Sequence, residues 1–200
     1  MTGARRASRS TRELRVGTYA RFDADRVRRT GAPEVILGEG KRSEHLLGLL
    51  HGLKRRGRGA LVSRPTPAQL KLLRAGARGG LPLTFLANDR VVRLAGPLGS
   101  EVAGGTVALL SGGTADVGLA EEARAILEEL GVRVVHRYDV GVAGVHRLDR
   151  ALKAIARERP AVYLVFAGRE GSLPTVVAGL VRAPVVGIPT SVGYGRGGRG

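Results

Sequence analysis

Residues 106–131 read TVALLSGGTADVGLAEEARAILEELG, and this stretch decides the fold of the second half of the chain. Its first five residues form a short apolar run that is typical of a buried strand. The small polar segment Ser111–Asp116 interrupts that run. A helical pattern rich in Ala, Glu and Leu follows and ends at a glycine. A strand, a glycine-containing loop and a helix in this order are the unit from which parallel α/β sheets are built.

The same alternation continues downstream. Further strands are predicted at 133–135, 161–167 and 184–188, and further helices at 148–157 and 175–180. Each strand runs into a loop of small residues. The predicted fold class is therefore α/β: a doubly wound parallel sheet with right-handed crossovers, three-layered and flavodoxin-like. Ligands of such sheets bind beyond the carboxyl ends of the strands, where all these loops fall.

The first half predicts a smaller β/α lobe. Its strands are expected at 34–37, 59–63, 83–86 and 90–94, and Ser43 and Thr66 are expected to cap two helices. The segment 96–100 is the expected linker. We expect a basic, flexible arm at 1–21 with a short helix near residue 15, a β/α lobe at 22–99, and a nucleotide-binding catalytic domain at 100–200.

Composition excludes several classes of protein. Apolar residues make up 43% of the 200 residues, which is enough for a packed core. The formal net charge is +16, but Arg is spread along the chain and aromatic residues are only 4%, so nucleic acid is not the expected main partner. No apolar run reaches the ~20 residues of a membrane helix. The absence of Cys excludes disulfides and fits the cytoplasm.

Three loops carry the candidate site residues. Ser111–Asp116 leads from a strand into a helix, where glycines, hydroxyls and helix amides suit a phosphate. This segment matches neither a P-loop nor a dinucleotide fingerprint, and a simple turn with Asp116 as a helix cap is the alternative. In the second loop, His146 is a candidate proton donor or acceptor and Arg147 an anion clamp. In the third loop, Glu170 lies between glycines and is a candidate pocket residue, as is Ser191 farther on.

In order, the loops read Ser-Gly-Gly-Thr-Ala-Asp, Gly-Val-Ala-Gly-Val-His-Arg, Ala-Gly-Arg-Glu-Gly-Ser-Leu-Pro and Pro-Val-Val-Gly-Ile-Pro-Thr-Ser-Val-Gly-Tyr-Gly. This combination resembles the superfamily of the AIR carboxylase PurE, and within it most closely the LarB family of nickel-pincer cofactor biosynthesis. PurE would have Ser-Ala-His-Arg before the second helix and Gly-Gly-Ala-Ala-His-Leu-Pro in the third loop. The segment 33–41, PEVILGEGK, also resembles the extra N-terminal region of LarB.

The resemblance implies a carboxylase and hydrolase. LarB-like enzymes add carbon dioxide or bicarbonate to the pyridinium ring of nicotinic acid adenine dinucleotide and release AMP. No permanently bound cofactor is implied; Mg²⁺ is left open. A homo-oligomer resembling an octamer is implied, with no membrane. The residues implied as catalytic are Asp116, His146 and Glu170. The residues implied to bind substrate are Ser111, Gly112, Gly113, Thr114, Arg147, Gly168, Gly171, Ser172, Pro174, Ser191 and Gly193.

In one respect the chain departs from the LarB pattern. LarB-like sequences continue past Gly-Tyr-Gly into a helix with Asn-Ser-Cys-Ala, whose Cys adds to the ring. This sequence holds no Cys. We expect a C-terminally truncated or divergent member, in which no residue replaces the thiolate. A PurE-type carboxylase or mutase of purine biosynthesis and a non-catalytic nucleotide-binding module stay open as alternatives.

Overall fold

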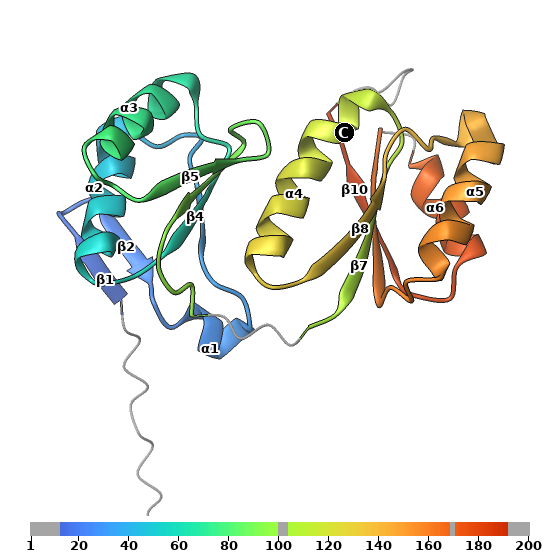
Figure 1. Ribbon diagram of the computed structural model, residues 1–200, viewed down its shortest axis with the longest axis horizontal. Helices are drawn as coiled ribbons and strands as arrows, with labels where there is room; N and C mark the ends of the chain where they lie inside the picture. The colour runs from blue at the N-terminus through green and yellow to red at the C-terminus, as the bar shows by residue number, and fades with distance from the viewer. Residues whose placement is uncertain (1–12, 100–103, 169–170, 192–200) are drawn as a thin grey trace, which may run out of the picture. The chain divides into compact units, whose positions relative to one another are not determined.

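The computed structural model describes residues 13–99, 104–168 and 171–191. Contacts divide the chain into two compact units, one of residues 1–84 and 93–100 and one of residues 85–92 and 101–200 (Figure 1). Each unit has its own sheet and its own buried residues. None of the helices within the described ranges is both long and apolar enough to cross a membrane.

The second unit is a parallel α/β sheet. Its elements are β7 (Thr106–Ser111), α4 (Val117–Glu129), β8 (Arg133–Arg137), α5 (Val145–Ala156), β9 (Val162–Ala167), α6 (Ser172–Leu180) and β10 (Val185–Pro189). The strand order is β10-β9-β7-β8, and all three pairings are parallel. The predicted fold class, a doubly wound flavodoxin-like sheet, is confirmed. Its switch point lies between β7 and β9, where successive connections leave in opposite directions.

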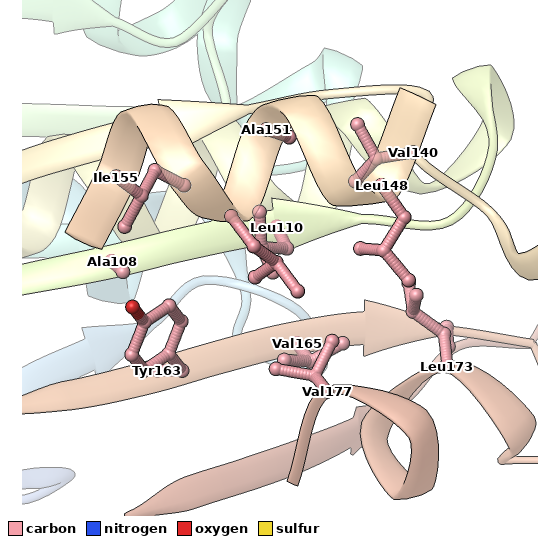
Figure 2. Close-up of a cluster of buried hydrophobic side chains, with 12 residues drawn as sticks. Ala108, Leu110, Val140, Leu148, Ala151, Ile155, Tyr163, Val165, Leu173 and Val177 are labelled. Atoms are coloured by element: carbon pink, nitrogen blue, oxygen red, sulfur yellow. The ribbon is translucent and has the colours of Figure 1, made fainter. Parts of the chain in front are cut away.

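Helices cover both faces of this sheet, which makes three layers. Helix α4 lies on one face, and α5 and α6 lie on the other (Figure 1). The side chains of β7 alternate accordingly: Leu109 packs on the α4 side, whereas Ala108 and Leu110 pack on the side of α5 and α6. Figure 2 shows the larger of the two clusters, in which Leu148 of α5 and Leu173 of α6 meet above the sheet.

The first unit holds a four-stranded sheet and a two-stranded one. Its elements are β1 (Glu13–Val16), β2 (Ala20–Asp23), α1 (Arg26–Thr30), β3 (Val35–Leu37), α2 (Ser43–Arg55), β4 (Ala60–Ser63), α3 (Pro67–Arg78), β5 (Leu83–Leu86) and β6 (Val91–Leu94). The contact division cuts through β5 and β6, whose inner ends belong to the segment 85–92. The larger sheet has the order β3-β4-β6-β5, with β3 parallel to β4. The four strands expected for this lobe, and the helices after Ser43 and Thr66, are therefore present.

The segment from Glu13 to Asp23 differs from the expected flexible arm and short helix. It is an antiparallel hairpin in which Leu14 pairs with Phe22. Val16 and Phe22 are buried, and an Arg56 guanidinium of the helix cap region donates to the Arg15 carbonyl oxygen at 3.0 Å. The alternation of apolar and polar residues is short and contains several arginines, so it is a weak signal for a strand in the sequence. Packing of Val16 and Phe22 stabilises the hairpin. The part of the arm before residue 13 lies outside the described residues.

Three helices begin earlier or are capped differently than the sequence predicts. Helix α5 begins at Val145 instead of residue 148, and α6 begins at Ser172 instead of residue 175. Helix α2 has Arg42 as its N-cap, so Ser43 is its first helical residue and not its cap. In each case small or polar residues that resemble a loop in sequence form the first helical turn.

Thr66 caps α3 as predicted. Its hydroxyl oxygen accepts the Gln69 amide at 3.3 Å, and the Gln69 side-chain oxygen accepts the Thr66 amide at 2.8 Å. This reciprocal pair is a capping box, and Gln69 is buried beneath it.

We predict that Thr66→Ala lowers the free energy of unfolding by about 1 kcal/mol, because the Gln69 amide in the first turn of α3 loses its acceptor. Ser43→Ala, a matched change at the start of α2, should be close to neutral because no side-chain cap bond is present there. Urea unfolding followed by circular dichroism measures both. Equal effects of the two substitutions would contradict the assignment of caps.

Candidate functional site

The carboxyl ends of the central strands are joined by backbone hydrogen bonds. The Gly112 amide, just past β7, donates to the Phe166 carbonyl oxygen of β9 at 2.9 Å. The Val140 amide, past β8, donates to the Ser111 carbonyl oxygen at 3.0 Å. The loops after β7, β8 and β9 therefore meet at the switch point, where a ligand of this fold class binds.

Asp116 is held inside this junction. The side chain is 5% exposed, and both of its oxygens accept hydrogen bonds. Oδ2 accepts the Gly113 amide at 3.0 Å, and Oδ1 accepts the Thr190 hydroxyl, from just past β10, at 2.6 Å. The carboxylate thus joins the first loop of the sheet to its last strand. Fully paired in this way, it is a structural tie in addition to any role toward a ligand.

Ser111 has a similar internal position. It is 0% exposed, and its hydroxyl oxygen accepts the Asp139 amide at 3.3 Å. The members of this loop that reach the surface are Gly112 and Gly113, which are half-buried, and Thr114 and Ala115, which are exposed. Thr114 begins a short 3-10 turn (Thr114–Asp116) that leads directly into α4. Backbone amides of this turn and the Thr114 hydroxyl are therefore the groups that suit a phosphate.

Two glycines of the second loop make close contacts, and the contact of Gly141 excludes a side chain. A Cβ added at Gly141 would lie 2.8 Å from the Gly112 carbonyl oxygen, which is backbone and cannot move aside. A Cβ added at Gly144 would lie 2.5 Å from Nε of Arg147. The first glycine lets two loops touch, and the second gives the Arg147 guanidinium room to lie along the backbone.

An arginine cluster lies at the end of β8. Arg147 bonds to Asp139 at 2.5 Å, and Asp139 adopts a left-handed backbone conformation with φ of 54°. Arg147, Arg150 and Arg137 line a cavity of about 440 Å³ together with this carboxylate. Three guanidinium groups against one carboxylate make the cavity attractive to a phosphate or carboxylate of a ligand.

Behind this cluster, on the α4 side, lies a stacked pair of rings. His136 stacks on Tyr138 with ring centroids 4.8 Å apart, and the Tyr138 hydroxyl donates to Glu121. Burial, and then this hydrogen bond, raise the pKa of Tyr138 well above its usual range, so the phenol stays protonated. Burial and the nearby Arg124 lower the pKa of His136. The pair therefore adds no charge to the cavity wall near neutral pH.

The structure locates the other predicted site residues as follows. His146 is exposed in the first turn of α5, next to Arg147. Gly171 has a positive φ and precedes α6, whose first turn contains Ser172 and Pro174. Gly168 is half-buried at the end of β9, and Ser191 is exposed just after Thr190. Glu170 and Gly193 lie outside the described residues.

Four residues at this site are not predicted from the sequence. One is Thr190, whose partner, Asp116, is 74 residues away in the chain. The others are Asp139, Arg137 and Arg150, which the sequence does not distinguish from the many other exposed charged residues. An available signal was the spacing of Arg147 and Arg150, which lie on one face of a helix.

The part of the chain that the structure describes holds no group of three or more acidic or histidine side chains able to bind a metal ion. A Mg²⁺ ion at these loops would take most of its ligands from substrate phosphates and water.

Known proteins resemble both units of the chain. A family model described as AIR carboxylase matches residues 106–198, and one described as LarB/PurE-like N-terminal domain matches residues 13–81. An uncharacterised protein of Methanocaldococcus jannaschii is 35% identical over 180 residues, which is 88% of this chain and 69% of that protein. The chain belongs to the AIR carboxylase family.

Two further relatives of this AIR carboxylase family member align over shorter stretches. The N5-carboxyaminoimidazole ribonucleotide mutase of the same organism is 34% identical over 84 residues, 42% of this chain and 51% of that protein. The probable N5-carboxyaminoimidazole ribonucleotide mutase of Methanothermobacter thermautotrophicus is 34% identical over 93 residues, 44% of this chain and 27% of that protein. The resemblance to the LarB and PurE group is confirmed, and every candidate site residue lies within the AIR carboxylase match.

We predict that Thr190→Val lowers the free energy of unfolding by about 1–3 kcal/mol, because an oxygen of the buried Asp116 carboxylate loses its donor. The matched control is Thr175→Val, on exposed Thr175, whose hydroxyl bonds to the Gly171 carbonyl oxygen. That control should change stability by less than about 0.5 kcal/mol. Denaturant unfolding measures both, and a Thr190→Val effect no larger than the control would contradict the tie.

Proposed function

We propose that this protein is a LarB-like enzyme of nickel-pincer cofactor assembly. Its substrate is nicotinic acid adenine dinucleotide, which it carboxylates on the pyridinium ring and cleaves at the phosphoanhydride. The products are AMP and the pyridinium-3,5-biscarboxylic acid mononucleotide. We further propose that it works in the cytoplasm as a homo-oligomer.

The observation that carries the proposal is the pairing of two family matches in one chain. The AIR carboxylase match alone fits a purine enzyme equally well. The LarB/PurE-like N-terminal match covers most of the first unit, including the hairpin that begins at Glu13. The second loop supports the same choice, because Gly141 and Gly144 belong to the Gly-Val-Ala-Gly-Val-His-Arg segment, which differs from the Ser-Ala-His-Arg expected of PurE.

The charged groups and amides at the junction suit a dinucleotide. A dinucleotide carries two phosphates between two nucleosides, so it needs cationic groups and backbone amides spread over several loops. The arginine cavity supplies cations beside the start of α5, and the turn after Gly113 supplies amides at the start of α4. The nicotinate carboxylate adds a third negative charge, for which Arg137 or Arg150 is available.

Carboxylation of the pyridinium ring requires that this electron-poor ring become temporarily electron-rich. A nucleophile adds to a ring carbon of the pyridinium, and the resulting electron-rich ring attacks carbon dioxide through another carbon. That carbon then loses its proton, and departure of the nucleophile restores the aromatic ring. In the phosphoanhydride step, water attacks one phosphorus and AMP leaves. His146, exposed beside Arg147, is the proposed proton acceptor, with Asp116 and Glu170 as proposed positioning or acid-base groups.

A second candidate function rests on the named relatives. The mutase and the probable mutase of N5-carboxyaminoimidazole ribonucleotide are each 34% identical to less than half of this chain, so a purine carboxylase or mutase is the defined alternative. Its substrate is a mononucleotide with one phosphate and no adenylate. A nucleotide-binding module without catalysis is the third reading, because the chain contains no Cys to act as nucleophile.

We predict that the protein binds nicotinic acid adenine dinucleotide and that Arg147→Gln weakens this binding about tenfold, as expected for one charge-assisted contact to phosphate. The matched control is Arg133→Gln, at the opposite end of β8, where Arg133 pairs with Glu158 at 2.6 Å. Titration calorimetry measures both. Binding of aminoimidazole ribonucleotide in preference to the dinucleotide would favour the purine alternative instead.

We predict that the 200 residues alone, without the Cys-bearing helix on which the proposed carboxylation depends, incorporate no label into the ring when incubated with the dinucleotide and labelled bicarbonate. The reason is that hydroxyls are poor nucleophiles without an adjacent base, and no thiolate is present. The same chain carrying a helix with Asn-Ser-Cys-Ala should incorporate label. Mass spectrometry of the product detects the added carboxylate. Robust turnover by the 200 residues alone would contradict the thiolate mechanism.

A further inference from the structure

A second cavity lies at the opposite edge of the same sheet. Its volume is about 580 Å³, and its lining comes from the last turns of α5, the amino-terminal end of β9 and the segment that joins α6 to β10. The candidate site lies at the carboxyl ends of the strands, so the two cavities are separated by the length of the strands. A volume of this size accommodates a small organic molecule.

The inner wall of this cavity carries one polar group. Tyr163 is 3% exposed and lines the cavity, and burial raises the pKa of its phenol, which stays protonated. Figure 2 shows its ring rising from β9 beneath α5, with the hydroxyl oxygen at the far end from the strand. No described residue forms a hydrogen bond with the hydroxyl. The hydroxyl can therefore donate a hydrogen bond to a ligand atom that enters the cavity.

The rim of the cavity is cationic. Lys153, Arg159 and Arg182 line it, together with the carboxylate of Asp149. Lys153 bonds to Asp149 at 2.7 Å, which neutralises both. The guanidinium groups of Arg159 and Arg182 have no carboxylate partner within the described ranges. Two unpaired cations at the mouth of one cavity favour an anionic head group.

The walls between rim and floor are apolar. Leu152 and Ala156 contribute side chains from α5, and Ala183 contributes one from the segment before β10. Leu180, the last residue of α6, is 63% exposed and also lines the cavity. An exposed leucine beside a concave apolar wall provides a surface that an alkyl or aryl group can cover.

We propose that this cavity binds a small organic anion, with its apolar body against Leu152 and Leu180 and its charged head between Arg159 and Arg182. The chemical class is a medium-chain carboxylate or alkyl phosphate. Tyr163 donates to a polar atom of the ligand or to a water molecule that the ligand holds. The proposal is independent of the reaction at the other edge.

A second copy of this chain is the less suitable occupant. The chain has a formal net charge of +16, so a copy brings positive charge toward a mouth that is already positive. The cores of protein interfaces are also depleted of charged residues, whereas this mouth has three cations and one carboxylate.

The test uses decanoate and decyl phosphate as probes, with decanol and decyltrimethylammonium as the neutral and cationic controls. Titration calorimetry on the whole 200-residue chain should detect binding of both anions and at least tenfold weaker binding of both controls. Tighter binding of one anion identifies the preferred head group. Binding should persist in the presence of saturating nicotinic acid adenine dinucleotide, because the two cavities lie at opposite edges.

Variants locate the binding. Replacing both rim arginines, Arg159→Gln with Arg182→Gln, should weaken decanoate binding about tenfold. Exposed Arg157, one residue past α5 and absent from the lining, gives the matched control Arg157→Gln, which should have no effect. Tyr163→Phe should weaken binding roughly two- to tenfold, as expected for one lost hydrogen bond.

Two results would overturn the proposal. One is equal binding of decanoate by the wild-type chain and the double arginine variant. The other is the absence of any anion binding at millimolar concentration. Analytical ultracentrifugation under the same conditions tests whether a second copy of the chain occupies the cavity instead. A dimer that dissociates in the double arginine variant, without anion binding, would assign this face to a second copy.

Discussion

The hydrogen bond from the Gly112 amide to the Phe166 carbonyl oxygen is the contact on which the arrangement of the site depends. It joins the two central strands, β7 and β9, at the point where their chains leave in opposite directions. The loop after β8 must then fit against this junction, and it does so through Gly141, where any side chain would strike the Gly112 carbonyl. The glycines of these loops are thus needed for loop-to-loop contact, and the surface left for a ligand is formed by amides, Thr114 and arginines.

In the second unit, Asp116 and Asp139 are paired within the protein, whereas several guanidinium groups face cavities. Its buried carboxylate at the junction, Asp116, is fully hydrogen-bonded, and Asp139 pairs with Arg147. Guanidinium groups, in contrast, remain at the mouths of cavities at both edges of the sheet. Part of the excess positive charge of the chain therefore lies at these two cavity mouths.

The sequence predicts the second unit well because three of its four strands, β7, β9 and β10, are largely apolar runs and its helices have clear periodicity. The family is recognisable for a related reason: the loops that carry it, such as Ser111–Asp116, are short and local. Two kinds of feature escape prediction. The hairpin at Glu13–Asp23 is short and rich in Arg, so its alternation is weak, and packing on the first unit decides its structure. The bond between Asp116 and Thr190 joins distant segments, and single-sequence patterns carry no information on such pairs.

That same bond has a consequence for how the protein folds. Its partners are separated by 74 residues, and the bond closes only when the last described strand, β10, has paired with β9. Contacts between distant residues form late because closing a long loop is entropically costly. A chain emerging from the ribosome therefore contains the Ser-Gly-Gly-Thr-Ala-Asp loop long before it can hold that loop in its final shape. The loop therefore reaches its final shape only together with the completed sheet.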